Sequence, residues 1–333
     1  MATIKDVAKM AGVAVSTASY ALNGQNKVKP ETKKKIEDAA KKLNYQKNGI
    51  ASDLKKSQTK TIALILSDIS GPFFSEIIKG VQQVTLENGY DLIACSSLEG
   101  EDRIAVKFLK EKRVDGVVVF AHTINDDTVL ESAREGFPIV VLDRYIEHDA
   151  VINISVDNVQ GGFLATEHLI QLGHKDIAFI SGPMDSDDNL ERHKGFKQAL
   201  QRFRLQEHSK WNIFGNFTQE GGYKAIKMLI MQGDLPTAIF FANDEMAIGG
   251  LKAFKEKGIR IPEDISVIGF DDILLSQYMT PPLTTIRQPE YDVGALAAHL
   301  IFRVLNGEDT NHCYKFATEL VVRETTGPAR VKI

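Results

Sequence analysis

The chain has few of the residues on which several kinds of site depend. Its 333 residues include two cysteines, Cys95 and Cys313, which have neither metal-site spacing nor a disulfide framework. No run of eighteen apolar residues is present, so we expect no membrane-spanning helix and no membrane partner. The N-terminus has no long apolar segment of the signal-peptide kind. We therefore expect a cytoplasmic protein that holds no metal and no cofactor.

Arginine is missing from the first hundred residues, and Arg103 is the first in the chain. Residues 1–60 nevertheless hold thirteen lysines against five acidic residues, a formal charge of +8. Because the whole chain carries −4, residues 61–333 carry −12. A small basic region beside a large acidic one indicates that the basic region binds a polyanion and that the rest has another role.

The sequence motifs of several common enzyme classes are also missing. No Gly-x-Gly-x-x-Gly follows a strand, and neither a Gly-Lys-Ser/Thr loop nor a Gly-x-Ser-x-Gly elbow occurs. Asp143 and Asp271 could form an acid–base pair in a sugar-active enzyme, and a sugar-binding protein is a second remote alternative. We expect no catalytic residues.

The apolar pattern of residues 1–46 predicts three short helices. The first begins after Thr3 as N-cap, with an acidic residue three positions on, and ends at Gly12. The second runs from about Val15 to Leu22 and is ended by Asn23-Gly24, and the third begins near Pro30. Two short helices joined by a tight turn and braced by a third form a helix-turn-helix unit, although an ordinary three-helix bundle with a lysine-rich surface is the alternative.

Residues 3–13, Thr-Ile-Lys-Asp-Val-Ala-Lys-Met-Ala-Gly-Val, carry a specific resemblance. Together with Ser16-Thr17-Ala18-Ser19, Ala21-Leu22-Asn23-Gly24 and the segment from Thr32 to Tyr45, they resemble the head of the LacI/GalR family of bacterial transcription regulators. The resemblance implies that the second helix enters the major groove of DNA. It departs from the family pattern at Ala14, where Ser is common, and at Tyr20, which cannot make a bidentate Arg–guanine contact.

The resemblance also implies that residues 47–60 are a hinge helix that orders on DNA, pairs across a dimer and inserts Leu54 into the minor groove. A flexible tether is the alternative that composition alone favours. About seven residues cannot hold a helix alone in water, so such a helix must fold on binding. The DNA-binding residues that we expect in head and hinge are Thr3, Val15, Ser16, Thr17, Tyr20, Asn23, Lys27, Ile50, Leu54 and Lys55.

From residue 61 onward, apolar strands alternate with amphipathic helices. Continuous Val and Ile runs such as 116–120 and 138–142 indicate strands buried on both faces, which are typical of parallel sheets covered by helices. The resemblance implies a periplasmic-binding-protein-like body with two parallel-sheet lobes and three crossovers. We expect the head at 1–46, the hinge at 47–60 and the effector-binding and dimerisation domain at 61–333. The first lobe would span about 61–160 and 291–320, and the second about 161–290 and 321–333.

Polar residues follow several of the predicted strands, at the edge where ligands bind in open α/β sheets. Each could merely cap the next helix, but together they match the family's effector-binding positions. Two carboxylates, an arginine and an aromatic face suit an uncharged polyol better than a phosphorylated ligand. The effector-binding residues that we expect are Phe73, Phe74, Asp143, Arg192, Phe217, Asn243 and Asp271.

These patterns predict a small all-α helix-turn-helix head on an α/β body, acting as a transcription regulator. We expect a repressor that binds near-palindromic double-stranded operator DNA as a homodimer and senses a small molecule, with a sugar as the leading hypothesis. A purine- or nucleoside-responsive regulator, or a global catabolite regulator that uses a phosphoprotein, is the alternative. The sequence leaves open whether the ligand releases DNA or promotes its binding; we favour release.

Overall fold

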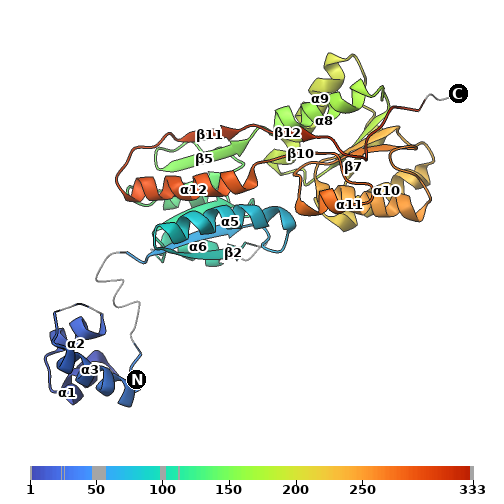
Figure 1. Ribbon diagram of the computed structural model, residues 1–333. Coiled ribbons are helices and arrows are strands. Elements are labelled where there is room, and N and C mark those ends of the chain that lie inside the picture. Colours follow the sequence, from blue (N-terminus) through green and yellow to red (C-terminus); the bar gives the residue numbers. More distant parts are fainter. Residues whose placement is uncertain are drawn as a thin grey trace. The chain divides into compact units, whose positions relative to one another are not determined.

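The computed structural model describes residues 2–23, 25, 27–46, 58–97, 103–111 and 113–330. The chain divides into two compact units, Met1–Thr59 and Lys60–Ile333. The first unit is small and helical, and the second is a two-lobed α/β body (Figure 1). The predicted fold class, a helix-turn-helix head on a body of parallel sheets, is thereby confirmed.

The head contains α1 (Ile4–Ala11), α2 (Val15–Leu22) and α3 (Pro30–Lys42), as the apolar pattern predicts. Thr3 begins α1 through a capping box, in which its amide nitrogen and hydroxyl each donate to Asp6 Oδ2 at 2.8 Å. Gly12 ends α1 with a φ of 67°, a left-handed conformation that glycine adopts without steric cost. The core that joins the helices consists of small and branched residues, Val7, Ala8, Ala18, Ala21, Ile36, Ala39 and Ala40.

The first lobe of the body is built on a six-stranded parallel sheet in the order β11-β5-β4-β3-β1-β2. Its strands are β1 (Thr61–Leu66), β2 (Asp91–Ser96), β3 (Gly116–Phe120), β4 (Ile139–Leu142), β5 (Val151–Val156) and β11 (Cys313–Phe316). The central strands are buried on both faces, which explains their continuous apolar runs.

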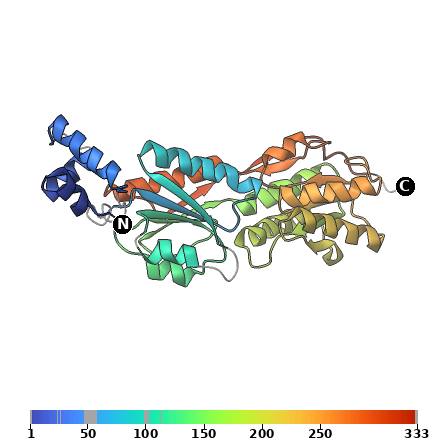
Figure 2. The same cartoon turned by 90° about the horizontal axis from the view of Figure 1, so that it is seen from below.

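Helices cover both faces of this sheet. One face carries α5 (Pro72–Glu87) and α12 (Glu290–Leu305), and the other carries α6 (Arg103–Lys110) and α7 (Asp126–Ser132). In Figure 2 the sheet lies between α5 above it and the teal-green helices α6 and α7 below it. α5 and α12 pack against each other, and they lie side by side in Figure 1.

The second lobe has a four-stranded parallel sheet in the order β7-β6-β8-β9. The strands are β6 (Ile177–Ser181), β7 (Asn212–Phe214), β8 (Ala238–Phe241) and β9 (Ser266–Ile268). Around them lie α8 (Asn158–Gln171), α9 (Asp187–Arg202), α10 (Gln219–Gln232), α11 (Asp244–Glu256) and the 3-10 turns Ser209–Trp211 and Leu274–Tyr278. Six phenylalanines of the described residues are fully buried here, namely Phe179, Phe196, Phe240, Phe241, Phe254 and Phe270.

The chain passes between the lobes three times. It leaves the first-lobe sheet after β5 and enters α8, returns between β10 (Thr285–Arg287) and α12, and crosses again between β11 and β12 (Glu319–Val321). β10 and β12 pair as an antiparallel ribbon. α8 therefore begins beyond the first crossing at 158, and the last crossing lies between 316 and 319.

Candidate functional site

Three of the predicted effector residues have unusual backbone conformations at or after strand ends. Asp143 follows β4 with a φ of 55°, Phe217 lies beyond β7 with a φ of 55°, and Asp271 lies beyond β9 with a φ of 112°. Positive φ angles cost a non-glycine residue of order 1–3 kcal/mol and persist only where the surrounding structure enforces them. Such residues cluster at binding sites, so these positions mark one edge of each lobe as a candidate site.

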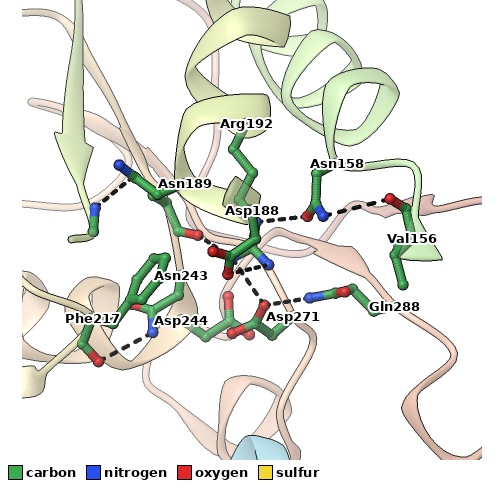
Figure 3. Close-up of polar contacts among 12 residues, drawn as sticks. Val156, Asn158, Asp188, Asn189, Arg192, Phe217, Asn243, Asp244, Asp271 and Gln288 are labelled. Carbon is green, nitrogen blue, oxygen red and sulfur yellow. Dashed lines mark hydrogen bonds and ion pairs between the residues drawn. The ribbon is translucent and has the colours of Figure 1, made fainter. Parts of the chain in front are cut away.

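Arg192 lies at the centre of a buried polar network in the second lobe. It projects from α9 and is 2 % exposed. Its Nε donates to Asn158 Oδ1 at 2.9 Å, and its Nη1 donates to the Ala242 carbonyl at 2.6 Å and lies 3.3 Å from Asp271 Oδ1 (Figure 3). The guanidinium also lies 3.9 Å from the centroid of the Phe270 ring. The protein thus holds Arg192 from the first crossover, the end of β8 and the end of β9.

The carboxylates beside Arg192 are also held by side chains. Gln288, on the second crossover, donates from Nε2 to Asp271 Oδ1 at 2.7 Å. Asp188 accepts from the Ser186 hydroxyl and lies 3.6 Å from Arg192 Nη2. Burial raises the pKa of Asp271 well above its ordinary value, and the charge of Arg192 opposes that shift. The site therefore joins Arg192 to two carboxylates, and burial disfavours the charged form of one of them, Asp271.

Asn243 and Asp244, at the end of β8, each bond separate parts of the second lobe to one another. Asn243 Oδ1 accepts from the Met246 amide at 3.0 Å and so caps α11, while its Nδ2 donates to the Phe217 carbonyl at 3.2 Å. Asp244 is fully buried and accepts from the Ser276 and Thr285 hydroxyls at 2.5 and 2.6 Å. Burial raises the pKa of Asp244 to about 7. Asn243 fixes the backbone of Phe217, and Asp244 ties the 3-10 turn and β10 to α11.

Asp143 supplies the first lobe's carboxylate, next to a cavity between the lobes. Its Oδ1 accepts from the Val156 amide at 3.2 Å. Burial, followed by the nearby charge of Asp188, raises its pKa to about 7, while Arg192 opposes the shift. The cavity has a volume of about 290 Å³, and the residues that line it are Asp143, Arg144, Tyr145, Asn153, Ser155, Asn158, Asp187, Leu190, Glu191, Lys194 and Cys313.

Phe73 and Phe74 lie on the first turn of α5 and pack in an aromatic cluster rather than lining that cavity. The rings of Phe73 and Phe74 lie 5.3 Å apart, and they lie 5.9 and 5.6 Å from the Phe120 ring at the end of β3. All three pairs meet edge to face, the arrangement that aromatic quadrupoles favour. Phe217 instead lies 5.6 Å from the Arg192 guanidinium. The predicted aromatic residues therefore divide between the lobes.

Sequence reasoning missed four residues of this region, Asn158, Asp188, Gln288 and Glu290. Asn158 and Gln288 lie on crossovers, so their proximity to Arg192 and Asp271 depends on how the chain passes between the lobes. Asp188, in the first turn of α9, has the sequence pattern of a helix-start acid. Burial raises the pKa of Glu290 to about 9, and the only signal for it was an acid after Pro289.

The head presents most of its predicted DNA-binding residues on an accessible surface. Val15, Ser16 and Tyr20 of α2 are exposed, whereas Thr17 is half-buried. Asn23 Nδ2 donates to Ser19 Oγ at 3.2 Å, and the ammonium of Lys27 lies 5.3 Å from the Tyr20 ring centroid. Thr3 is used in the capping box. Ile50, Leu54 and Lys55 lie outside the described residues.

A basic helix-turn-helix head joined to a two-lobed α/β body defines a ligand-controlled transcription regulator. The chain belongs to the lacI family of bacterial regulatory proteins, whose family model matches residues 3–48, and a periplasmic binding protein-like domain matches residues 166–326. It is accordingly a DNA-binding transcriptional repressor of that family.

The most similar curated relatives include repressors named PurR. The HTH-type transcriptional repressor PurR of Histophilus somni is 38% identical over 329 residues, which cover 98% of this chain and 99% of the relative. That of Pasteurella multocida is also 38% identical over 329 residues and 98% of each chain.

Two solved structures cover 98% of this chain. The lac repressor dimer bound to operator and the anti-inducer ONPF has a TM-score of 0.80 at 28% identity over 99% of its own chain. The complex of the transcriptional regulator CelR with cellobiose has a TM-score of 0.74 at 30% identity over 100% of its chain. Within the described residues, no helix has the length and apolarity needed to cross a membrane.

Proposed function

We propose that this repressor acts as a homodimer on a near-palindromic operator and takes a purine base or nucleoside, rather than the sugar that the sequence favours, as its effector. The observation that carries the ligand assignment is the buried Arg192 network. The network presents acceptor-rich carboxylates, whereas its guanidinium is already bonded to Asn158, to the Ala242 carbonyl and to Asp271.

The charges around the cleft favour an uncharged ligand with several hydrogen-bond donors. Asp143, Asp187 and Glu191 line the cavity together with two cations, Arg144 and Lys194. The carboxylates Asp188 and Asp271 lie close behind it, against Arg192. The Arg192 guanidinium is already bonded to protein groups, so a phosphate would find few free donors here, whereas carboxyl oxygens accept readily from ring N–H, amino and hydroxyl groups. Nucleotides and sugar phosphates are therefore disfavoured.

The choice between purines and sugars rests on ring chemistry and on the relatives. A planar base can stack on the Phe217 ring with either face, whereas a sugar offers an aromatic ring only its C–H side. The curated relatives named PurR favour the purine or nucleoside alternative. The cellobiose complex of CelR keeps a sugar as the competing candidate.

A thermal-shift screen of the full chain tests the ligand class. The probes are adenine, guanine, hypoxanthine, adenosine and guanosine, with ribose, cellobiose and guanosine monophosphate as comparisons. A ligand at a hundred times its dissociation constant should stabilise the folded protein by about 2.7 kcal/mol. We expect this stabilisation from a base or nucleoside, and its loss in Asp271→Asn. Stabilisation by ribose or cellobiose alone would return the assignment to sugars.

Exposed apolar residues support the homodimer. Leu274, Leu275 and Tyr278 of the 3-10 turn are exposed, with Tyr278 at 73 %, and Leu86 and Ile93 are exposed on α5 and the edge strand β2. Three large apolar side chains exposed on one short turn form a group of the kind found at protein interfaces. We expect Tyr278→Asp to lower the dimer fraction in sedimentation equilibrium, with Tyr145→Asp as the control. An unchanged mass would exclude this turn from the interface.

The head's charge and exposed residues support operator binding through α2. Lysines supply point charges at phosphates, and Val15, Ser16 and Tyr20 are free to face bases. Tyr20→Ala should relax base preference at particular positions of a duplex selected from a random pool, while Lys27→Met should weaken all duplexes alike. Uniform weakening by Tyr20→Ala would exclude base recognition by this ring.

The effector acts, in this proposal, by changing the pose of the lobes and with it the ordering of residues 47–60 on DNA. Free energy of ligand binding is thereby exchanged for free energy of linker ordering. The coupling must be reciprocal, so DNA changes the ligand's affinity by the same factor as the ligand changes that of DNA. Titrating the selected duplex with and without the ligand found in the screen measures both its size and its sign.

A further inference from the structure

α5 and α12 form a pair of helices whose backbones touch. A Cβ atom at Gly80 of α5 would clash with the Tyr291 carbonyl oxygen of α12, and one at Gly294 would clash with the Ile77 carbonyl oxygen. No side chain lies between the two backbones at these points, so neither helix can shift there without moving its partner. The two helices therefore move as one block.

One end of this helix pair carries the aromatic cluster of the first lobe and follows Gln288, which bonds Asp271. α5 begins at Pro72 and carries Phe73 and Phe74 on its first turn. α12 begins at Glu290, two residues after Gln288, whose side chain donates to Asp271 at 2.7 Å. A displacement of Asp271 or of the aromatic cluster would therefore directly displace the start of α12 or of α5.

The other end of the helix pair lies where the linker enters the body. Beyond α5, Tyr90 is buried, and its ring meets the Phe302 ring of the last turns of α12 edge to face, with centroids 5.0 Å apart. The ammonium of Lys60 lies 4.6 Å from the centroid of the same Tyr90 ring. The Tyr90 ring therefore contacts two parts of the body. It meets α12 at Phe302, and it meets Lys60, the first residue of the body, through a cation–π contact.

Lys60 is also held by its backbone. Its amide donates to Asp115 Oδ2 at 2.9 Å, and its carbonyl accepts from the Asp91 amide at 2.8 Å. Its φ of 57° is a left-handed conformation that a lysine adopts only under constraint. Residues 47–59 precede this fixed point in the sequence, so Lys60 is the residue through which the linker is joined to the body.

We propose that Tyr90 is a positioning residue that joins the α5–α12 pair to Lys60 and so transmits the state of the effector cleft to the DNA-binding linker. The proposal rests on the proposed function, in which the ligand changes DNA affinity through that linker. A purely structural Tyr90 would fill space beside Phe302, and its replacement would lower stability without changing the response to ligand. The two roles therefore differ in the coupling between sites.

The test uses the full chain, four single variants and one double variant. Tyr90→Phe keeps the ring, Tyr90→Leu removes it, and Lys60→Met removes the cation. Leu92→Ala is the matched control, because Leu92 packs on the same first-lobe core but belongs to the neighbouring strand β2. For each protein we measure the thermal midpoint and the dissociation constants for the selected duplex and for a scrambled duplex. We then measure how guanosine and hypoxanthine change the dissociation constant for the selected duplex.

We expect Tyr90→Leu and Lys60→Met each to weaken the selected duplex about fivefold and to reduce the ligand's effect on it about fivefold, the lower end of ordinary coupling factors. Scrambled-duplex binding, through the intact head, and ligand affinity without DNA should stay within about twofold of wild type, a small change on the scale of such couplings. Tyr90→Phe should behave as wild type, and Leu92→Ala should lower only the thermal midpoint.

The outcomes separate this inference from the proposed function. Equal coupling in Tyr90→Leu, Leu92→Ala and wild type would overturn the positioning role while leaving the ligand assignment intact. If neither guanosine nor hypoxanthine binds wild type, the ligand class is wrong, and the selected-duplex affinities still decide the role of Tyr90. A double variant of Lys60→Met and Tyr90→Leu should be no weaker than the weaker single variant; additive losses would show that the two residues act separately.

Discussion

The two lobes of the body are similar α/β units, yet the residues predicted to bind the effector differ in chemistry between them. The second lobe presents a hydrogen-bonded arginine–carboxylate network around Arg192, Asp188 and Asp271. The first lobe presents an aromatic cluster and a single buried carboxylate, Asp143. Polar partners with directional bonds are gathered in the second lobe, and rings that tolerate small displacements are gathered in the first.

This difference indicates a division of labour. The Arg192 network is bonded to two crossovers, so it holds its geometry before any ligand arrives and suits selection of the ligand. The aromatic cluster sits on α5, which packs closely against α12 and is followed by Tyr90, whose ring lies 4.6 Å from the Lys60 ammonium. We therefore expect the second lobe to determine which molecule binds and the first lobe to determine what binding does to DNA affinity.

Removing the arginine from the second lobe should have the largest effect. Arg192→Met leaves Asp271 and Asp188 buried without their cation, and breaking a buried ion pair in this way costs about 3–5 kcal/mol. We expect a fall of that size in the free energy of unfolding measured by urea denaturation, together with loss of ligand binding. Lys197→Met, an exposed lysine on the same helix, is the control and should change stability by about 0.5 kcal/mol or less. If Arg192→Met lowers the free energy of unfolding as little as Lys197→Met does, the network adds no stability.

Replacing the first lobe's carboxylate should have the opposite sign. The pKa of Asp143 is raised to about 7 by burial, so in the folded state it binds its proton more tightly than in the unfolded state, where the ordinary value of 3.8 applies. Its contribution to stability is therefore fully present below about pH 4 and is lost as the pH rises through about 7.

Asp143→Asn removes this titration, and asparagine tolerates the φ of 55° and can accept from the Val156 amide. We expect the variant to match wild type near pH 4 and to be more stable by roughly 2–4 kcal/mol at pH 8. The measurement is the difference in the free energy of unfolding between the two proteins across this range. Comparing proteins at each pH cancels the other buried acids, such as Asp244 and Glu290. A difference that does not change with pH would mean that Asp143 is ionised in the folded protein.

Much of the fold could be predicted because its central strands are apolar on both faces. The runs at β1, β3, β4, β6 and β8 are continuous, and the three head helices have clear starts and stops. The apolar pattern does not predict β5, because Asn153 interrupts its apolar run. The Asn153 amide is buried and bonds both the nitrogen and the carbonyl of Ile146, so a polar residue occupies a core strand as part of a turn. β7 and β11 are short edge strands with exposed polar residues and carry little pattern.

The candidate site was predictable only in part, for a related reason. Strand-end residues such as Asp143 and Asp271 are marked by the strand that precedes them, and the position of the edge follows from the parallel sheet. Gln288 and Asn158 reach the site through crossovers, whose placement depends on the packing of both lobes. Arg192 was named as a ligand contact, but its bonds to Asn158 and to the Ala242 carbonyl required the three-dimensional arrangement.

Matched substitutions of aromatic residues in the two lobes should give the smallest effects and the sharpest comparison. Phe74→Leu removes two edge-to-face contacts from the first lobe, and Phe217→Leu removes a ring near Arg192 from the second. An aromatic contact is worth about 0.5–1.5 kcal/mol, so loss of a ring that stacks on the ligand should raise the ligand's dissociation constant in Phe217→Leu by about two- to tenfold. If the lobes divide selection from transmission, Phe217→Leu should keep the wild-type ratio of duplex affinities with and without ligand, whereas Phe74→Leu should lower it.

Isothermal titration measures the ligand affinity, and fluorescence anisotropy measures the duplex affinities from which the ratio is calculated. A reduced ratio in both variants would mean that the second lobe transmits as well as selects, and the division of labour between the lobes would be wrong.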